Sequence, residues 1–128
     1  MVSRGAWRWT GVVSEPGAAA KTGASVGAGP AGLSTAVTAA QRGHKVTLFD
    51  KSDEIGGQLN MAKQVPGKEE FWGLVDWYRV MVADAGVTLE LGRDVSADDL
   101  PGFAAVVLAT CLLTRDTAIP SHARYVDL

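Results

Sequence analysis

Three glycines near the start of the chain have the spacing G-x-G-x-x-G: Gly27, Gly29 and Gly32. In this spacing the first glycine permits a tight turn out of a strand, and the second leaves room for a ligand beside the backbone. The third lets the following helix pack closely against a sheet. Pro30 suits the first turn of that helix, because the N–H that proline lacks would have no partner there. The pattern predicts a strand, a turn and a helix whose N-terminus can hold a phosphate.

The residues after this turn support the prediction. Apolar residues follow with the spacing of one helix face: Leu33, Ala36, Val37 and Ala40. Gly43 marks the end of the helix, and the apolar run 46–49 predicts a strand buried on both faces. Asp50 ends this run, close to the ~20-residue offset at which an acidic residue binds the ribose of a dinucleotide. The strand expected at 23–26 is weak, since it has one bulky apolar residue. The alternative is a glycine-rich turn without a ligand.

A second glycine-rich segment, residues 51–58, contains the pair Gly56 and Gly57. This pair is either a simple turn or a second flexible backbone segment near the pyrophosphate, and we favour the second interpretation.

The apolar pattern of the remaining residues predicts one more helix and two more strands. A helical apolar stripe lies between Pro66 and Gly86: Phe71, Leu74, Val75, Tyr78, Met81, Val82 and Ala85. Residues 87–91 alternate like a strand, 94–102 are rich in turns, and 104–109 predict a buried strand. The fold class is therefore α/β, a Rossmann-like dinucleotide-binding domain with a mostly parallel sheet and flanking helices, and incomplete.

Composition excludes several other functions. The 128 residues fit one domain, and a net charge of -2 gives no basic face for nucleic acid. No apolar run reaches the ~20 residues of a membrane span. The single cysteine, Cys111, excludes an internal disulfide and an iron–sulfur or cysteine zinc site supplied by this chain alone. Two scattered histidines make no metal site, and we expect a cytoplasmic protein.

Residues 26–50, together with the run EIGGQLNMAKQVPGKEEF at 54–71, closely resemble a group of NADH:flavin oxidoreductases. This is the group of 2,4-dienoyl-CoA reductase and trimethylamine dehydrogenase. Its members carry a TIM barrel with FMN and an iron–sulfur cluster, followed by paired FAD- and NAD(P)H-binding domains. The resemblance extends from about residue 25 to 120. It implies that residues 23–128 are an incomplete FAD/NAD(P)-binding domain, and we expect residues 1–22 to be an atypical, disordered tail.

The resemblance also implies which residues bind the cofactor, which we expect to be FAD, with ADP or NAD possible. The cofactor-binding residues would be Gly27, Gly29, Pro30, Ala31 and Gly32 at the pyrophosphate, Asp50 and Lys51 at the adenosine ribose, Gly57 and Gln58 in the following loop, and Ala109 and Thr110 at the end of a later strand. An acidic Asp50 disfavours a 2′-phosphate. No catalytic or metal-binding residue is expected.

The chain also departs from the family pattern. Cys111 replaces the glycine of an Ala-Thr-Gly motif, the run 113–115 replaces a Pro-Arg step, and Ser121 replaces a glycine. The barrel with its FMN and cluster sites is absent. We expect the FAD-binding module of a flavin-dependent oxidoreductase similar to NADPH-dependent 2,4-dienoyl-CoA reductase, inactive alone and partnered by a separate barrel-bearing chain. The alternatives are a non-catalytic ADP-binding module, or a truncated product without independent function.

Overall fold

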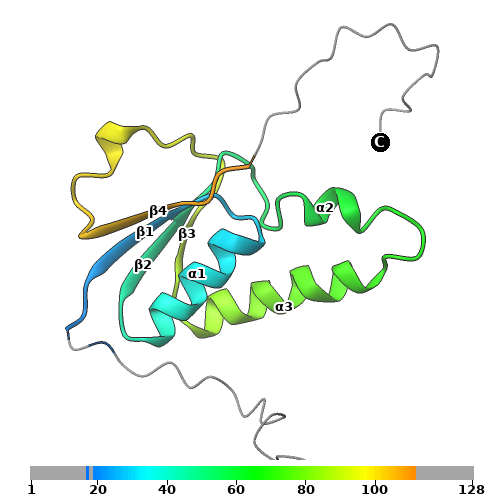
Figure 1. Cartoon of the computed structure of the whole chain (residues 1–128), viewed down its shortest axis with the longest axis horizontal. Coiled ribbons are helices and arrows are strands. Elements are labelled where there is room, and N and C mark those ends of the chain that lie inside the picture. The colour runs from blue at the N-terminus through cyan, green and yellow to red at the C-terminus, as the bar shows by residue number, and fades with distance from the viewer. Residues whose placement is uncertain (1–16, 18, 112–128) are drawn as a thin grey trace, which may run out of the picture.

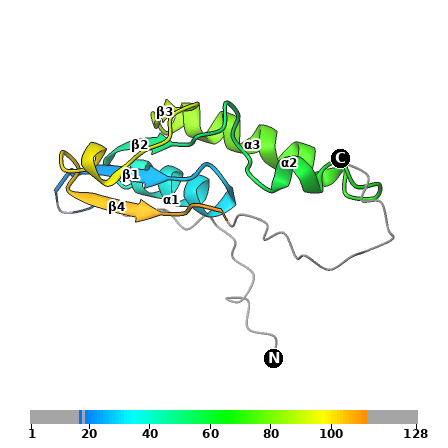
Figure 2. The ribbon, with the colours of Figure 1, turned by 90° about the horizontal axis from the view of Figure 1, so that it is seen from above.

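The computed structural model describes residue 17 and residues 19–111 of the chain. In this part, four strands form one sheet in the order β3-β2-β1-β4, which Figures 1 and 2 show from two sides. The elements in chain order are β1 (Thr22–Val26), α1 (Pro30–Gln41), β2 (Lys45–Phe49), α2 (Leu59–Ala62), α3 (Glu70–Asp84), β3 (Thr88–Glu90), the short 3-10 helix η1 (Ala97–Asp99) and β4 (Ala105–Leu108). All three strand pairings are parallel. The predicted Rossmann-like fold is confirmed.

Strand β1 is central in the sheet, although its sequence is the weakest of the predicted strands. It pairs with β2 on one side and with β4 on the other. Its small residues Ala24 and Ser25 are fully buried, and the Ser25 hydroxyl donates a hydrogen bond to the Gly32 carbonyl in α1 at 3.2 Å. Small side chains suit this position because helix α1 lies directly against the strand. β1 begins at Thr22, one residue before the predicted domain boundary.

Each face of the sheet has its own hydrophobic core. On one face, helices α1 and α3 pack on β2, with Leu33, Leu48, Val75 and Val82 among the buried residues. On the other face, β1 and β2 are covered by the connection between β3 and β4, in which Phe103 packs on Phe49 in a T-shaped arrangement with ring centroids 5.8 Å apart. The helices and the connection therefore fix the sheet from opposite sides.

The prediction that residues 104–109 form a buried strand is wrong about burial, because the strand found there, β4, is exposed. It forms the outer edge of the sheet, and all four of its residues are exposed, Leu108 to 72%. Among residues 19–111, β1 is the one strand that pairs with β4, so the other edge of β4 has no neighbouring strand.

The predicted helical stripe corresponds to α3. Val75, Tyr78 and Val82 are buried as expected, while Trp72 and Trp77 on the same helix are half-exposed. The four-residue helix α2 and the helix η1 were not predicted. Within the described range, no helix has the length and apolar character needed to cross a membrane. Residues 1–16 and 18 of the tail predicted at 1–22, and the departures at 113–115 and 121, lie outside the described residues.

Candidate functional site

The turn between β1 and α1 requires glycine at two positions. Gly27 has φ +111° and donates its N–H to the Phe49 carbonyl at 2.7 Å. A Cβ on Gly27 would collide with the Ala109 carbonyl, and one on Gly32 would collide with the Gly27 carbonyl. Both glycines are therefore needed by the fold itself, whether or not a ligand binds.

Gly29 is different, because nothing in the described part of the chain requires a glycine there. Its φ of -76° and ψ of 178° are open to any residue, and a Cβ would meet no atom of the described residues within 4 Å. Gly29 is also the N-cap of α1, which has no side-chain capping hydrogen bond. The first-turn N–H groups, including those of Ala31 and Gly32, and the positive end of the helix dipole thus lie beside open space. This arrangement suits an anionic group.

Asp50 lies at the carboxyl end of β2 and is bound to the turn. Its Oδ2 accepts a short hydrogen bond from the N–H of Ala28, and its Oδ1 accepts one from the N–H of Ser52 at 2.8 Å. Each carboxylate oxygen has a second lone pair, so hydroxyl groups of a ligand can still bind there. Lys51 beside it is exposed.

The loop with the glycine pair approaches the same turn. The N–H of Gly56 donates to the Ala28 carbonyl at 2.8 Å, and a Cβ on Gly57 would lie 3.0 Å from the Cα of Gly29. The exposed Gln58 follows as the N-cap of α2. The structure thus brings this loop to the glycine turn, and its role beside a pyrophosphate stays a prediction.

Asn60 was missed by the sequence reasoning. Its Nδ2 donates to the Ile55 carbonyl at 2.9 Å, which closes the loop, and its Oδ1 is buried without a hydrogen-bond partner among the described residues. The signal available in the sequence was a lone Asn shortly after the glycine pair, which by itself indicates only a turn.

The end of β4 completes this edge of the sheet. The N–H of Ala109 donates to the Val26 carbonyl at 2.8 Å, and Ala109 and Thr110 lie against Gly27. Thr110 and Cys111 are exposed. The predicted segments, from Gly27 to Thr110, therefore meet at the carboxyl edge of the sheet, where open α/β sheets bind their ligands.

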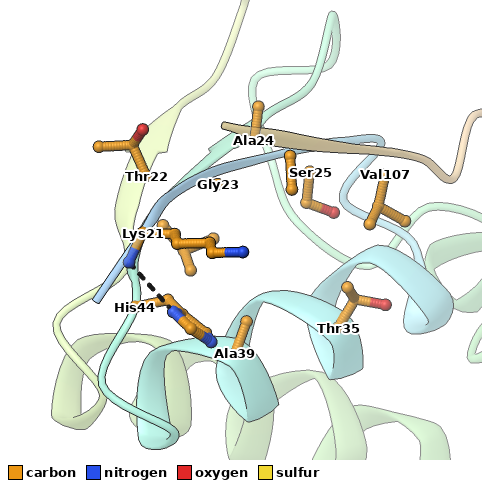
Figure 3. A pocket seen from close by; sticks show the side chains of 11 residues that line it. Lys21, Thr22, Gly23, Ala24, Ser25, Thr35, Ala39, His44 and Val107 are labelled. Atoms are coloured by element: carbon orange, nitrogen blue, oxygen red, sulfur yellow. Dashed lines mark hydrogen bonds between the residues drawn. The ribbon is translucent and has the colours of Figure 1, made fainter. Parts of the chain in front are cut away.

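A separate groove lies outside the glycine turn (Figure 3). It measures about 120 Å³ and lies between α1 and the strands β1 and β4, beside Gly23, Ala39 and Val107. At one end the N–H of Lys21 donates to His44 Nδ1 at 3.2 Å. The walls are largely apolar, and none of the residues that line this groove belongs to the glycine turn at 27–32. Among the described residues, no three potential metal ligands gather in one place.

Comparison with known proteins agrees with this geometry. The sequence profile of the NAD(P)-binding Rossmann-like domain matches residues 26–89. The fold and the glycine turn thus define a nucleotide-binding domain of the Rossmann class. The chain belongs to the family of NAD(P)-binding Rossmann-like domains.

Three similar proteins, all oxidoreductases, indicate which proteins contain a domain of this kind. N,N-dimethylglycine/sarcosine dehydrogenase of Chromohalobacter salexigens is 45% identical over 89 residues, which cover 66% of this chain and 12% of that protein. NADH oxidase of Thermoanaerobacter brockii is 40% identical over 87 residues, covering 66% of this chain and 13% of that protein. The structure of 2-naphthoyl-CoA reductase in complex with 2-naphthoyl-CoA is 33% identical with a TM-score of 0.72, covering 74% of this chain and 15% of that one.

These similarities confirm the resemblance to flavin oxidoreductases of the 2,4-dienoyl-CoA reductase and trimethylamine dehydrogenase type. The chain is a dinucleotide-binding domain of the kind that these oxidoreductases contain. It spans only 12–13% of the length of the curated relatives described above.

Proposed function

We propose that the chain is the FAD-binding module of a flavin-dependent oxidoreductase similar to NADPH-dependent 2,4-dienoyl-CoA reductase. The observation that carries the proposal is the open space at Gly29, a glycine that the fold does not require. It lies between the N-terminus of α1 and Gly57 of the second loop. A pyrophosphate placed there receives backbone N–H groups from the helix and meets no side chain.

The remaining residues would bind the adenosine half. The carboxylate of Asp50 would accept hydrogen bonds from the ribose hydroxyls, with Lys51 beside it, and would repel a 2′-phosphate. Thr110 would border the cofactor at the end of β4. The flavin supplies the redox chemistry when bound, and this chain's residues bind and orient the cofactor.

A second candidate is a non-catalytic module that binds ADP. The observation that favours it is the extent of the site, because the residues brought together around Gly29 and Asp50 serve a pyrophosphate and a ribose. Both candidate functions use the same glycine turn. They differ in whether the flavin half of FAD adds to the binding affinity.

Calorimetric titration with FAD, ADP, NAD and NADP tests the proposal. Gly29→Val should abolish binding, because the new side chain occupies the space of the pyrophosphate. Gly102→Val is the matched control, since a Cβ there also meets nothing within 4 Å. Tighter binding of FAD than of ADP supports the flavin module, and equal affinity supports the ADP module. Binding that survives Gly29→Val would overturn both.

We further propose that turnover requires a separate barrel-bearing chain. Electron transfer from NAD(P)H to a substrate needs two cofactor sites in contact, and one glycine turn serves one dinucleotide. The purified chain with FAD should oxidise NADH no faster than free flavin does. If NADH oxidation co-elutes with the chain in gel filtration and is lost in Gly29→Val, a separate barrel-bearing chain is not required.

A further inference from the structure

The loop that closes on the glycine turn leads into a helix that is too short to hold its own position. Helix α2 (Leu59–Ala62) has no fully buried residue and no side-chain cap. Isolated helices of this length are not stable in water, because one turn does not repay the entropy of ordering it. The position of α2, and of the glycine pair before it, must therefore be set by contacts with other elements.

Two of these contacts are at the end of α2. Lys63, its C-cap, is only 8% exposed. Trp72 of α3 contacts Lys63 in two ways: its Nε1–H donates to the Lys63 carbonyl at 3.2 Å, and its ring lies 4.1 Å from the Lys63 ammonium. None of the ion pairs found among the described residues includes Lys63. The indole ring thus stabilises the ammonium of this lysine by a cation–π interaction.

The other end of the same segment contacts the ligand turn. Gly56 donates to the Ala28 carbonyl at 2.8 Å, and Gly57 lies against Gly29. Between the two ends, backbone hydrogen bonds run from Asn60 to Gly57 and from Lys63 to Leu59. Residues 56–63 therefore form one hydrogen-bonded unit, held at the turn on one side and by Trp72 on the other.

We propose that Trp72 is a positioning residue for the dinucleotide: by holding Lys63, it keeps the loop at Gly56 and Gly57 against the pyrophosphate turn. Trp72 does not contact the ligand in this arrangement and acts through α2. The inference rests on the proposed function, because it assigns the loop to the nucleotide site.

The test compares two tryptophans of one helix. Trp72→Phe removes the Nε1–H and keeps an aromatic ring, and Trp77→Phe is the matched control. Trp77 is 50% exposed against 47% for Trp72, and its ring packs on Tyr78. We expect ADP and FAD to bind about three- to tenfold more weakly to Trp72→Phe and with unchanged affinity to Trp77→Phe. The melting temperatures of the two variants should agree, which separates positioning from general destabilisation.

A second pair of variants tests the ammonium. Lys63→Met keeps an apolar stem and removes the charge, and Lys63→Arg keeps a cation that can stack on the indole. We expect Lys63→Met to weaken nucleotide binding and Lys63→Arg to retain it. If Lys63→Met binds as tightly as wild type, the ammonium has no positioning role.

Amide hydrogen exchange separates this inference from the proposed function. The Gly56 N–H should exchange faster in Trp72→Phe than in wild type or Trp77→Phe, without any nucleotide present. If wild type binds nucleotide and Trp72→Phe binds equally well, the inference is overturned while the proposed function stands. If wild type binds no nucleotide, the proposed function fails. If the exchange rate of the Gly56 N–H is also unchanged in Trp72→Phe, Trp72 does not hold the loop, and the inference is overturned as well.

Discussion

The carboxylate of Asp50 accepts a hydrogen bond from the backbone N–H of Ala28, in the middle of the glycine turn. The two residues are 22 positions apart and belong to the ends of adjacent parallel strands, β2 and β1. The acidic residue that we assign to the ribose is therefore also a structural partner of the turn that we assign to the pyrophosphate. A change at Asp50 must affect both parts of the site.

Asp50→Asn should therefore weaken the binding of every nucleotide, but not to the same extent. Loss of the charged acceptor should cost about 1.5–3 kcal/mol of binding free energy for ADP and NAD. NADP should lose less, because the substitution also removes a repulsion toward its 2′-phosphate. Calorimetry on the variant and on wild type measures both effects, and Asp53→Asn in the exposed part of the same loop is the control. A wild-type preference for NADP would show that Asp50 does not select the nucleotide.

Two helical glycines should respond oppositely to alanine. Gly32→Ala forces a Cβ into the Gly27 carbonyl, so we expect a loss of about 1–3 kcal/mol in the free energy of unfolding. A Cβ on Gly73 in α3 would meet no atom within 4 Å among residues 19–111, so Gly73→Ala should stabilise the protein by about 1 kcal/mol. Urea unfolding monitored by circular dichroism measures both. Equal effects at the two positions would contradict the close packing of α1 on β1.

The short helix η1 should make stability depend on pH. The Ser96 backbone N–H, the Ser96 hydroxyl and Arg93 hold the pKa of Asp99 below its ordinary value of 3.8. A carboxyl group whose pKa is lowered by folding stabilises the folded state above its unfolded pKa, and this contribution is lost as the pH falls through the lower folded pKa.

The stability difference between wild type and Asp99→Asn should therefore be constant above about pH 5 and shrink as the pH falls below 3.8. Unfolding free energies measured across this range test the sign. Asp98→Asn, at the exposed neighbour in the same helix, is the control. A gap that widens in acid would contradict the hydrogen bonds assigned to Asp99.

The sequence predicted the parts of the site that depend on local pattern. The spacing of Gly27, Gly29 and Gly32 sets the turn, and the apolar periodicity after it sets α1, so both were predictable. The hydrogen bond from Ala28 to Asp50 was not, because it depends on the register of β1 with β2. Register is a tertiary property, and the small residues of β1 give no local signal for it.

Helix α2 and the Trp72–Lys63 contact were not predictable for a similar reason. A helix of four residues has too few positions to show a period, so its sequence resembles a loop. The burial of Lys63 also runs against the usual exposure of lysine and results from the position of Trp72 nine residues later. Only the packing of α2 on α3 shows that these residues act together.

The exposed edge strand gives the last prediction. Leu48 in β2 and Leu108 in β4 follow similar apolar patterns, yet Leu48 is fully buried and Leu108 is 72% exposed. Leu48→Ala should cost about 2–5 kcal/mol of unfolding free energy, because it leaves a cavity under α1 and α3. Leu108→Ala should change it by less than about 0.5 kcal/mol, as at other exposed sites. Urea unfolding of both variants measures the difference, and a large cost at Leu108 would mean that the outer side of β4 is covered in solution.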